Sequence, residues 1–221
     1  MVIKSVNTSS PGTVLLLVSP DGKSNGEVLR ISENLWREYT AKNDVSAGMS
    51  VTEYTYDTLK AMAEKTEALK EASRLVGSSD RSVYEITNRL KRKGHSQAAV
   101  KYALSELRDA GCVNERETCM RLAERDVETK HHGRIRVVDY LMSRGYDRSA
   151  VHEAADSVPA EKYREALLFN VREKYAMLSS DDISERRRAV AAVARMGFTF
   201  EEILSAQSEI RKEKHMAENG K

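Results

Sequence analysis

The sequence predicts a mainly α-helical protein. Three tandem three-helix repeats are expected to form an elongated, curved body behind a small N-terminal module of a β-hairpin and helix. Three observations support this fold class. One helix–turn–helix pattern occurs three times, with Gly94, Gly145 and Gly197 standing 51 and 52 residues apart. Aromatic residues make up only 6% of the chain and prolines number three, which favours helices over a β-rich core. Strand-like runs are confined to the first 60 residues.

Residues 1–64 form the predicted N-terminal module. The runs "GTVLLLV" and "GEVLRI" are typical of strands, and "SPDGKSNG" between them is typical of a hairpin turn. A short helix is expected at "SENLWREY", and "SVTE" from Ser50 has the spacing of a capping box that opens another helix at Val51. Two strands alone are only marginally stable. The module is therefore expected to dock on a helix or a partner.

The repeated turn shares five columns of residue types. Each glycine is expected to close a helix as a left-handed residue, and two positions later stands a residue that caps the next helix. Apolar or small residues stand four positions before the glycine and six and nine positions after it. Besides the glycines, the columns are Ser96, Asp147 and Thr199; Leu90, Leu141 and Val193; Val100, Val151 and Ile203; and Ala103, Ala154 and Ala206.

Each turn has room for a preceding helix. These helices are expected at about Lys65 to Leu75, Glu115 to Glu128 with Asn114 as its cap, and Ala160 to Met177. The repeats then cover residues 65–113, 114–159 and 160–213, followed by a frayed polar tail at 214–221. Periods near 50 residues are typical of tandem helical arrays, in which each unit buries part of its surface on its neighbour. Such a body is suited to lying along a partner.

The turn argument predicts different sensitivities at two glycines. Gly145 should hold the left-handed conformation, which is costly for a β-branched residue. Gly133 lies in "ETKHHGR", which we expect to be a loose, solvated polar connection. Gly145→Val is therefore expected to damage folding more than Gly133→Val.

Composition limits the location of the protein. The net charge is +2, and the longest strongly apolar run, Val14 to Val18, is far short of the roughly 20 residues of a membrane helix. The chain does not open with a secretion signal. Cys112 and Cys119 are two helical turns apart, about 10 Å, which is beyond disulfide reach. These features predict a reduced cytoplasmic protein without membrane contact, and we expect a monomer.

No catalytic, cofactor or metal site is expected. The "GKS" at Gly22 to Ser24 suggests a phosphate loop, but Leu17 stands where the required glycine should be. Cys112, Cys119 and the histidine pair His131 and His132 match no zinc spacing, and Cys119 has the pattern of a buried structural cysteine. The sequence offers no combination of nucleophile, base and orienting group. We expect a protein that is not an enzyme.

Charge is unevenly distributed. From Arg81 to Arg148 there are 15 Lys/Arg and 10 Asp/Glu, a net charge of +5, and the rest of the chain sums to −3. A helical wheel places Arg92, Arg121, Arg125 and Arg136 opposite the apolar faces of their helices. Two interpretations stay open: a solvated face of mixed charge, or a patch for an acidic or phosphate-bearing partner. The run Arg186 to Arg188 is a smaller second candidate.

Two stretches, "NRLKRKGHSQAAVKYALSELRDAGCVNERE" and "HHGRIRVVDYLMSRGYDRSAV", together resemble the RecX regulators of bacterial recombination. The resemblance covers about residues 65–210 and rests on the order and spacing of its motifs. The matching positions are Leu90, Lys93 and Gly94; Gly111, Cys112 and Val113; and Arg136, Val137, Leu141, Arg144 and Gly145. The chain departs from the family pattern at Asn114, Glu115, Thr118, Val137 and Met196.

The resemblance implies a regulator of DNA repair, recombination and the SOS response. RecX proteins bind the RecA recombinase, lie in the groove of the RecA–DNA filament and restrain filament growth, ATP hydrolysis, strand exchange and repressor cleavage. The alternative that we carry is a helical-repeat scaffold for another acidic protein or RNA; a hydrolase is a third. The candidate contacts with RecA or with DNA phosphates, which would not be sequence-specific, are Arg92, Arg121, Arg125, Arg136, Arg144 and Arg148.

Overall fold

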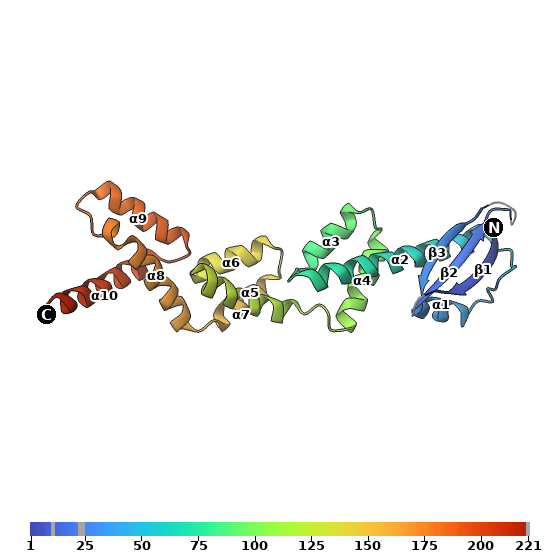
Figure 1. The fold of residues 1–221 in the computed structure, drawn as a ribbon, viewed down its shortest axis with the longest axis horizontal. Helices are drawn as coiled ribbons and strands as arrows, with labels where there is room; N and C mark the ends of the chain where they lie inside the picture. The colour runs from blue at the N-terminus through green and yellow to red at the C-terminus, as the bar shows by residue number, and fades with distance from the viewer. Residues whose placement is uncertain (10–11, 22–24, 220–221) are drawn as a thin grey trace. The chain divides into compact units, whose positions relative to one another are not determined.

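The computed structural model describes residues 1–9, 12–21 and 25–219. These residues form ten helices and one three-stranded antiparallel sheet (Figure 1), so the predicted mainly helical class with a small N-terminal sheet is confirmed. The chain divides into two compact units, residues 1–113 and 114–221, and their boundary coincides with the predicted end of the first repeat. In the described part of the chain, no helix combines the length and the apolarity needed to cross a membrane.

The N-terminal sheet contains one more strand than the sequence predicts. Strands β1 (Val2–Thr8), β2 (Thr13–Ser19) and β3 (Glu27–Ser32) pair in that order, and α1 (Glu33–Thr40) follows. The hairpin prediction covers β2 and β3; the middle of its turn, residues 22–24, is outside the described residues. The sequence pattern does not predict strand β1, because a bulge between Ile3 and Ser5 breaks the two-residue alternation of its apolar side chains.

The two helices predicted at Val51 and at Lys65 to Leu75 are one helix, α2 (Glu53–Ser78). Ser50 does not cap it, because Ser50 pairs with Val2 at the edge of the sheet; Thr52 accepts the capping hydrogen bond instead. No glycine or proline interrupts residues 49–76, so nothing stops the helix at residue 64.

Helix α2 belongs to two hydrophobic cores. Leu59 and Met62 pack with the sheet, whereas Ala68 and Ala72 pack with the next two helices. The boundary between the two hydrophobic cores therefore lies near the predicted boundary at residue 64. It falls inside a continuous helix instead of at a linker. This explains how the marginal sheet is stabilised: it docks on a helix of its own unit.

The nine helices from α2 to α10 form three groups of three in the described part of the chain, as predicted, although α2 begins within the predicted module. The first group is completed by α3 (Val83–Arg92) and α4 (Gln97–Asp109). The second contains α5 (Glu115–Lys130), α6 (Arg134–Ser143) and α7 (Arg148–Ser157). The third contains α8 (Ala160–Leu178), α9 (Ile183–Arg195) and α10 (Phe200–Asn219). Helix α10 continues through the predicted frayed tail to Asn219, because no breaker precedes Gly220.

The repeated turn has the predicted conformation in all three copies. Gly94, Gly145 and Gly197 have φ of 92°, 78° and 99°. In the first two copies, the N–H two residues after the helix cap donates back to the carbonyl of Leu90 (3.2 Å) or Leu141 (3.4 Å), as in a Schellman motif. The capping residues accept hydrogen bonds from the next helix, and the three apolar columns are buried in every copy.

The expectation for Gly133 is wrong. Gly133 is buried, its N–H donates to the Met196 carbonyl at 2.7 Å, and its backbone lies against Gly197. A Cβ at Gly133 would overlap the Gly197 carbonyl and lie 2.7 Å from the Phe198 ring. A Cβ at Gly197 would in turn overlap the backbone of Arg136. This glycine contact joins the second and third repeats, and it leaves no basis for ranking Gly133→Val as the milder change.

The histidine pair beside Gly133 is not a solvated loop either. The buried carboxylate of Asp126 accepts from His132 Nδ1 at 2.7 Å and from Lys130 Nζ at 2.8 Å. His131 caps α5 in a left-handed conformation, and its ring lies 3.9 Å from that of Phe169. The connection is therefore ordered, and its residues contact α5, α6 and α8.

Alanine substitutions should separate two reasons for glycine at the turns: the left-handed backbone conformation and the lack of space for a Cβ atom. Gly94 has open space around its missing Cβ, so Gly94→Ala should lower the free energy of unfolding by about 1–2 kcal/mol through backbone strain alone. Gly197→Ala adds a steric overlap, so its loss should exceed that of Gly94→Ala by about 1–3 kcal/mol. Urea unfolding measures both, and equal losses would contradict the close contact.

The two cysteines should differ in reactivity. Cys112 is exposed and Cys119 is fully buried, and burial raises the pKa of the Cys119 thiol to about 12. Because the thiolate is the reactive form, a thiol reagent at pH 8 should label one cysteine per native chain and both in urea. Rapid labelling of both in the native protein, followed by mass spectrometry of the peptides, would count against the buried position of Cys119.

Candidate partner-binding surface

The predicted arginines divide between the two units. Arg92 lies in the first unit, at the end of α3, and the other five lie in the second unit on α5, α6 and α7 or between α6 and α7. Five of the six are exposed, and the four arginines that helical wheels place outward are among them. Exposure is the property that a contact surface requires.

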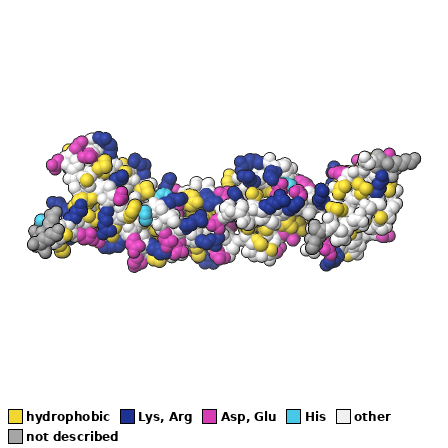
Figure 2. Space-filling model, in the orientation of Figure 1, with side chains coloured by type: hydrophobic (Ala, Val, Ile, Leu, Met, Phe, Trp, Pro, Cys, Tyr) yellow, Lys and Arg dark blue, Asp and Glu magenta, His cyan; other side chains and the backbone are white. Residues whose placement is uncertain are grey.

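Arg92 belongs to a basic cluster at the end of α3. Arg89, Lys91 and Arg92 are exposed in the last turn of the helix, and Lys and Arg side chains gather over α3 in Figure 2. Arg92 also lines a shallow hollow with Lys91 and Asn88. Cations near the carboxyl end of a helix are favoured by its dipole, so these residues also stabilise α3. The wheel identified only Arg92, although the run of basic residues before Gly94 marked the cluster.

The α3 turn is held in place from α2. Glu71 accepts from Lys93 at 2.8 Å and from His95 at 3.1 Å, and Glu64 accepts from the Ser96 backbone N–H at 2.6 Å. The Lys93 hydrogen bond is the main cause that lowers the pKa of the Glu71 carboxyl. Lys93 is therefore engaged within the fold, whereas Arg92 donates to the carbonyl of Asn88 in its own helix.

In the second unit, Arg121 and Arg125 are one turn apart on the exposed side of α5. Arg121 lies 4.0 Å from Glu117 in an exposed ion pair, which contributes little to stability. Leu122 and Ala123, their neighbours in the chain, are buried. The helix thus presents two arginines outward while it packs its apolar side into the core.

The first turns of α6 and α7 carry arginines and no acidic residue, although the Asp147 carboxylate caps α7. Arg134 and Arg136 lie in the first turn of α6, and Arg148 is the first residue of α7. Arg134 is paired with Asp156 at 2.6 Å, whereas Arg136 and Arg148 have no ion pair among the described residues. The positive end of the helix dipole disfavours a cation at this position but favours an anion. These exposed arginines are unfavourable for the helices and suited to an anionic partner.

Arg144 differs from the other candidates. It is half-buried, donates to the Tyr140 hydroxyl at 3.2 Å, and its guanidinium lies 5.8 Å from the ring centres of Tyr140 and Tyr146. Cations over aromatic faces contribute to stability. Arg144 thus has a packing role that its sequence position did not reveal. Arg186 of the second candidate run is also engaged, because it donates to the Ser180 carbonyl.

The described residues contain no group of three His, Cys, Asp or Glu side chains placed to hold a metal ion. Asp126 and His132 form a carboxylate–imidazole pair, but the second carboxylate oxygen is taken by Lys130. What the candidate residues provide is cationic side chains at a surface. Their chemistry is the binding of carboxylates or phosphates.

Comparison with solved structures places the fold. The chain aligns with a crystal structure of the regulatory protein RecX at a TM-score of 0.75 and 13% sequence identity. The alignment covers 93% of this chain and 98% of that one. It also aligns with a crystal structure of RecX from Lactobacillus salivarius at a TM-score of 0.61 and 13% sequence identity. This alignment covers 67% of this chain and 97% of that one. No family model and no curated protein matches the chain. The protein has the RecX fold.

Arg144 and Arg148 should respond oppositely to removal. Arg144→Ala should lower the free energy of unfolding by about 1 kcal/mol, because two ring contacts and a hydrogen bond are lost. Arg148→Ala should be neutral or slightly stabilising, since it removes a cation from a helix amino terminus. Thermal or urea unfolding of both variants tests this, and a destabilisation by Arg148→Ala as large as that by Arg144→Ala would contradict the assignment.

Proposed function

We propose that this protein is a non-catalytic regulator that binds the RecA–DNA filament and restrains RecA activity. The observation that carries the proposal is the RecX fold, which extends over 93% of the chain. The order of motifs around Gly94 and Gly145 supports the same family independently of the coordinates. The regulator would act in the cytoplasm, without a cofactor, as a monomer.

The exposed arginines supply the proposed contacts. Arg121 and Arg125 on α5, and Arg136 and Arg148 at helix amino termini, can meet phosphate oxygens or carboxylates of RecA. Arg92, with Arg89 and Lys91, forms a separate basic cluster on the first unit. Contacts to phosphates would be independent of DNA sequence and would weaken as salt rises.

The direct test adds the purified protein to RecA, single-stranded DNA and ATP. We expect the rate of ATP hydrolysis by RecA to fall as the protein is added, and this inhibition to weaken with rising salt because exposed charges are screened. No inhibition at excess protein, under conditions in which RecA filaments form, would refute the proposal. It would favour a scaffold for another acidic protein or RNA.

A charge-reversal variant tests the surface. Replacing Arg92, Arg121, Arg125 and Arg136 with Glu changes the charge by −8, from +2 to −6. All four side chains are exposed, so the fold should survive, and RecA inhibition should fall by at least about tenfold in potency. Single replacements should each cost far less, because one exposed ion pair is worth only about 0–1 kcal/mol.

A matched control separates position from net charge. Replacing Lys42, Lys60, Arg211 and Lys212 with Glu makes the same change of −8 at exposed positions outside the candidate surface. This control should retain most of the inhibition. If the arginine variant is folded and inhibits like the parent, the four arginines are only a solvated face. If both variants lose inhibition equally, net charge and not this surface is responsible.

A further inference from the structure

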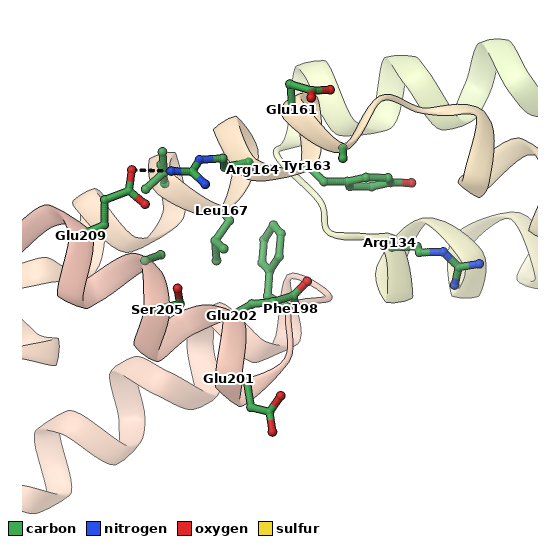
Figure 3. A pocket seen from close by; sticks show the side chains of 13 residues that line it. Arg134, Glu161, Tyr163, Arg164, Leu167, Phe198, Glu201, Glu202, Ser205 and Glu209 are labelled. Atoms are coloured by element: carbon green, nitrogen blue, oxygen red, sulfur yellow. Dashed lines mark hydrogen bonds and ion pairs between the residues drawn. The ribbon is translucent and has the colours of Figure 1, made fainter.

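The second unit contains a surface groove with a chemistry opposite to that of the arginines. It lies between α8, α10 and the start of α6, and its volume is about 680 Å³. Its apolar part is formed by Tyr163, Leu167, Leu168 and Phe198. In Figure 3 the Phe198 ring stands between Leu167 and Tyr163, and Ser205 points toward the groove from α10.

The glycine contact fixes the groove. Phe198 directly follows Gly197, and Arg134 directly follows Gly133, so the two backbones that touch also set the positions of two lining residues. Tyr163 is fixed as well, since its hydroxyl donates to the Ala155 carbonyl at 2.9 Å. The groove is therefore formed before a ligand arrives, which lowers the entropic cost of binding.

The charges around the groove are unbalanced. Both lining cations already have partners: Arg164 pairs with Glu209 at 2.7 Å, and Arg134 turns away to pair with Asp156. Among the described residues, Glu161, Glu201 and Glu202 have no cationic partner. Glu202 accepts from the Thr199 backbone N–H, which leaves its negative charge in place. Figure 3 places Glu161 and Glu201 on opposite rims, so carboxylates flank an apolar floor on both sides.

We propose that this groove binds a short segment of a protein partner that carries Leu or Phe anchors flanked by Lys or Arg. Apolar anchors would fill the floor beside Phe198 and Leu168, and the cations would meet Glu161 and Glu201. Nucleic acid is a poor occupant, because three unpaired carboxylates would repel its phosphates. The proposal is independent of RecA regulation: it assigns the protein a second contact surface, of opposite sign to the first.

The probe is a fluorescein-labelled helical peptide of about 12 residues, with Leu and Phe at i, i+4 and i+7 and Lys elsewhere. Its binding to the full chain is followed by fluorescence anisotropy at physiological salt. We expect saturable binding with a Kd of about 1–100 µM. A peptide with Glu in place of every Lys, and one with Ser in place of every Leu and Phe, should each bind at least about tenfold more weakly.

Two variants locate the binding site, and each has a matched control. Ser205→Trp fills the groove from an exposed position, whereas Ser208→Trp places the same side chain outside the groove on the same helix. The double change Glu161→Lys and Glu201→Lys reverses the rim charge. Glu53→Lys with Glu67→Lys makes the same change of +4 on α2. Glu53 lies in the first turn of its helix, as Glu161 and Glu201 lie in the first turns of theirs. Circular dichroism and thermal unfolding verify that each variant is folded.

Both groove variants should raise the Kd of the Lys peptide by at least about tenfold, and both controls should change it by less than about twofold. The charge-reversal pair decides the matter if Ser205→Trp fails to fold. Absence of saturable binding, equal losses in a variant and its control, or equal binding of the Glu peptide would each overturn the proposal. RecA inhibition is measured in parallel on the same variants, so that failure of this proposal and failure of RecA regulation remain distinguishable.

Discussion

A left-handed residue after the middle helix of each repeat is the constraint on which the helical part of the structure depends. It reverses the chain within two residues, so that the next capping residue and the buried columns on both sides of the turn are brought into register. At Gly197 a second constraint applies: there is no space for a Cβ atom, because the Gly197 backbone lies against Gly133. One position thus sets the geometry within the third repeat and its packing against the second.

The features predictable from sequence are those that depend on near neighbours. The turn glycines, their caps and the buried columns all follow from local conformation and helical period, and all are found in the structure. The start of α5 after its cap Asn114 is predictable for the same reason, because it depends on neighbouring residues. The chain shares its fold with a RecX structure at 13% identity, so most side chains differ although the fold is the same.

The missed features depend on residues distant in the chain or on an irregularity. Gly133 is constrained by Gly197, 64 residues later, and no local pattern reports such a contact. Strand β1 is obscured by its bulge. Arg144 has the sequence position of an exposed cation, but Tyr140 and Tyr146 cover it in the fold. The exposure of the other arginines was predictable, whereas the acidic groove combines residues of α6, α8 and α10 and was not.

The proposed function is a collective property of surface charge on the helical repeats. Individual exposed pairs contribute too little to define a binding site, so recognition must come from several side chains held in fixed positions. The central claim is that this scaffold occupies RecA–DNA filaments. Electron cryomicroscopy of RecA filaments on single-stranded DNA, saturated with the protein, tests it most directly. The account predicts added density in the filament groove that fits the helical repeats, with the arginine-bearing ends of α6 and α7 facing DNA phosphate or RecA carboxylates. Filaments indistinguishable from RecA alone, with the protein left free in solution, would contradict it.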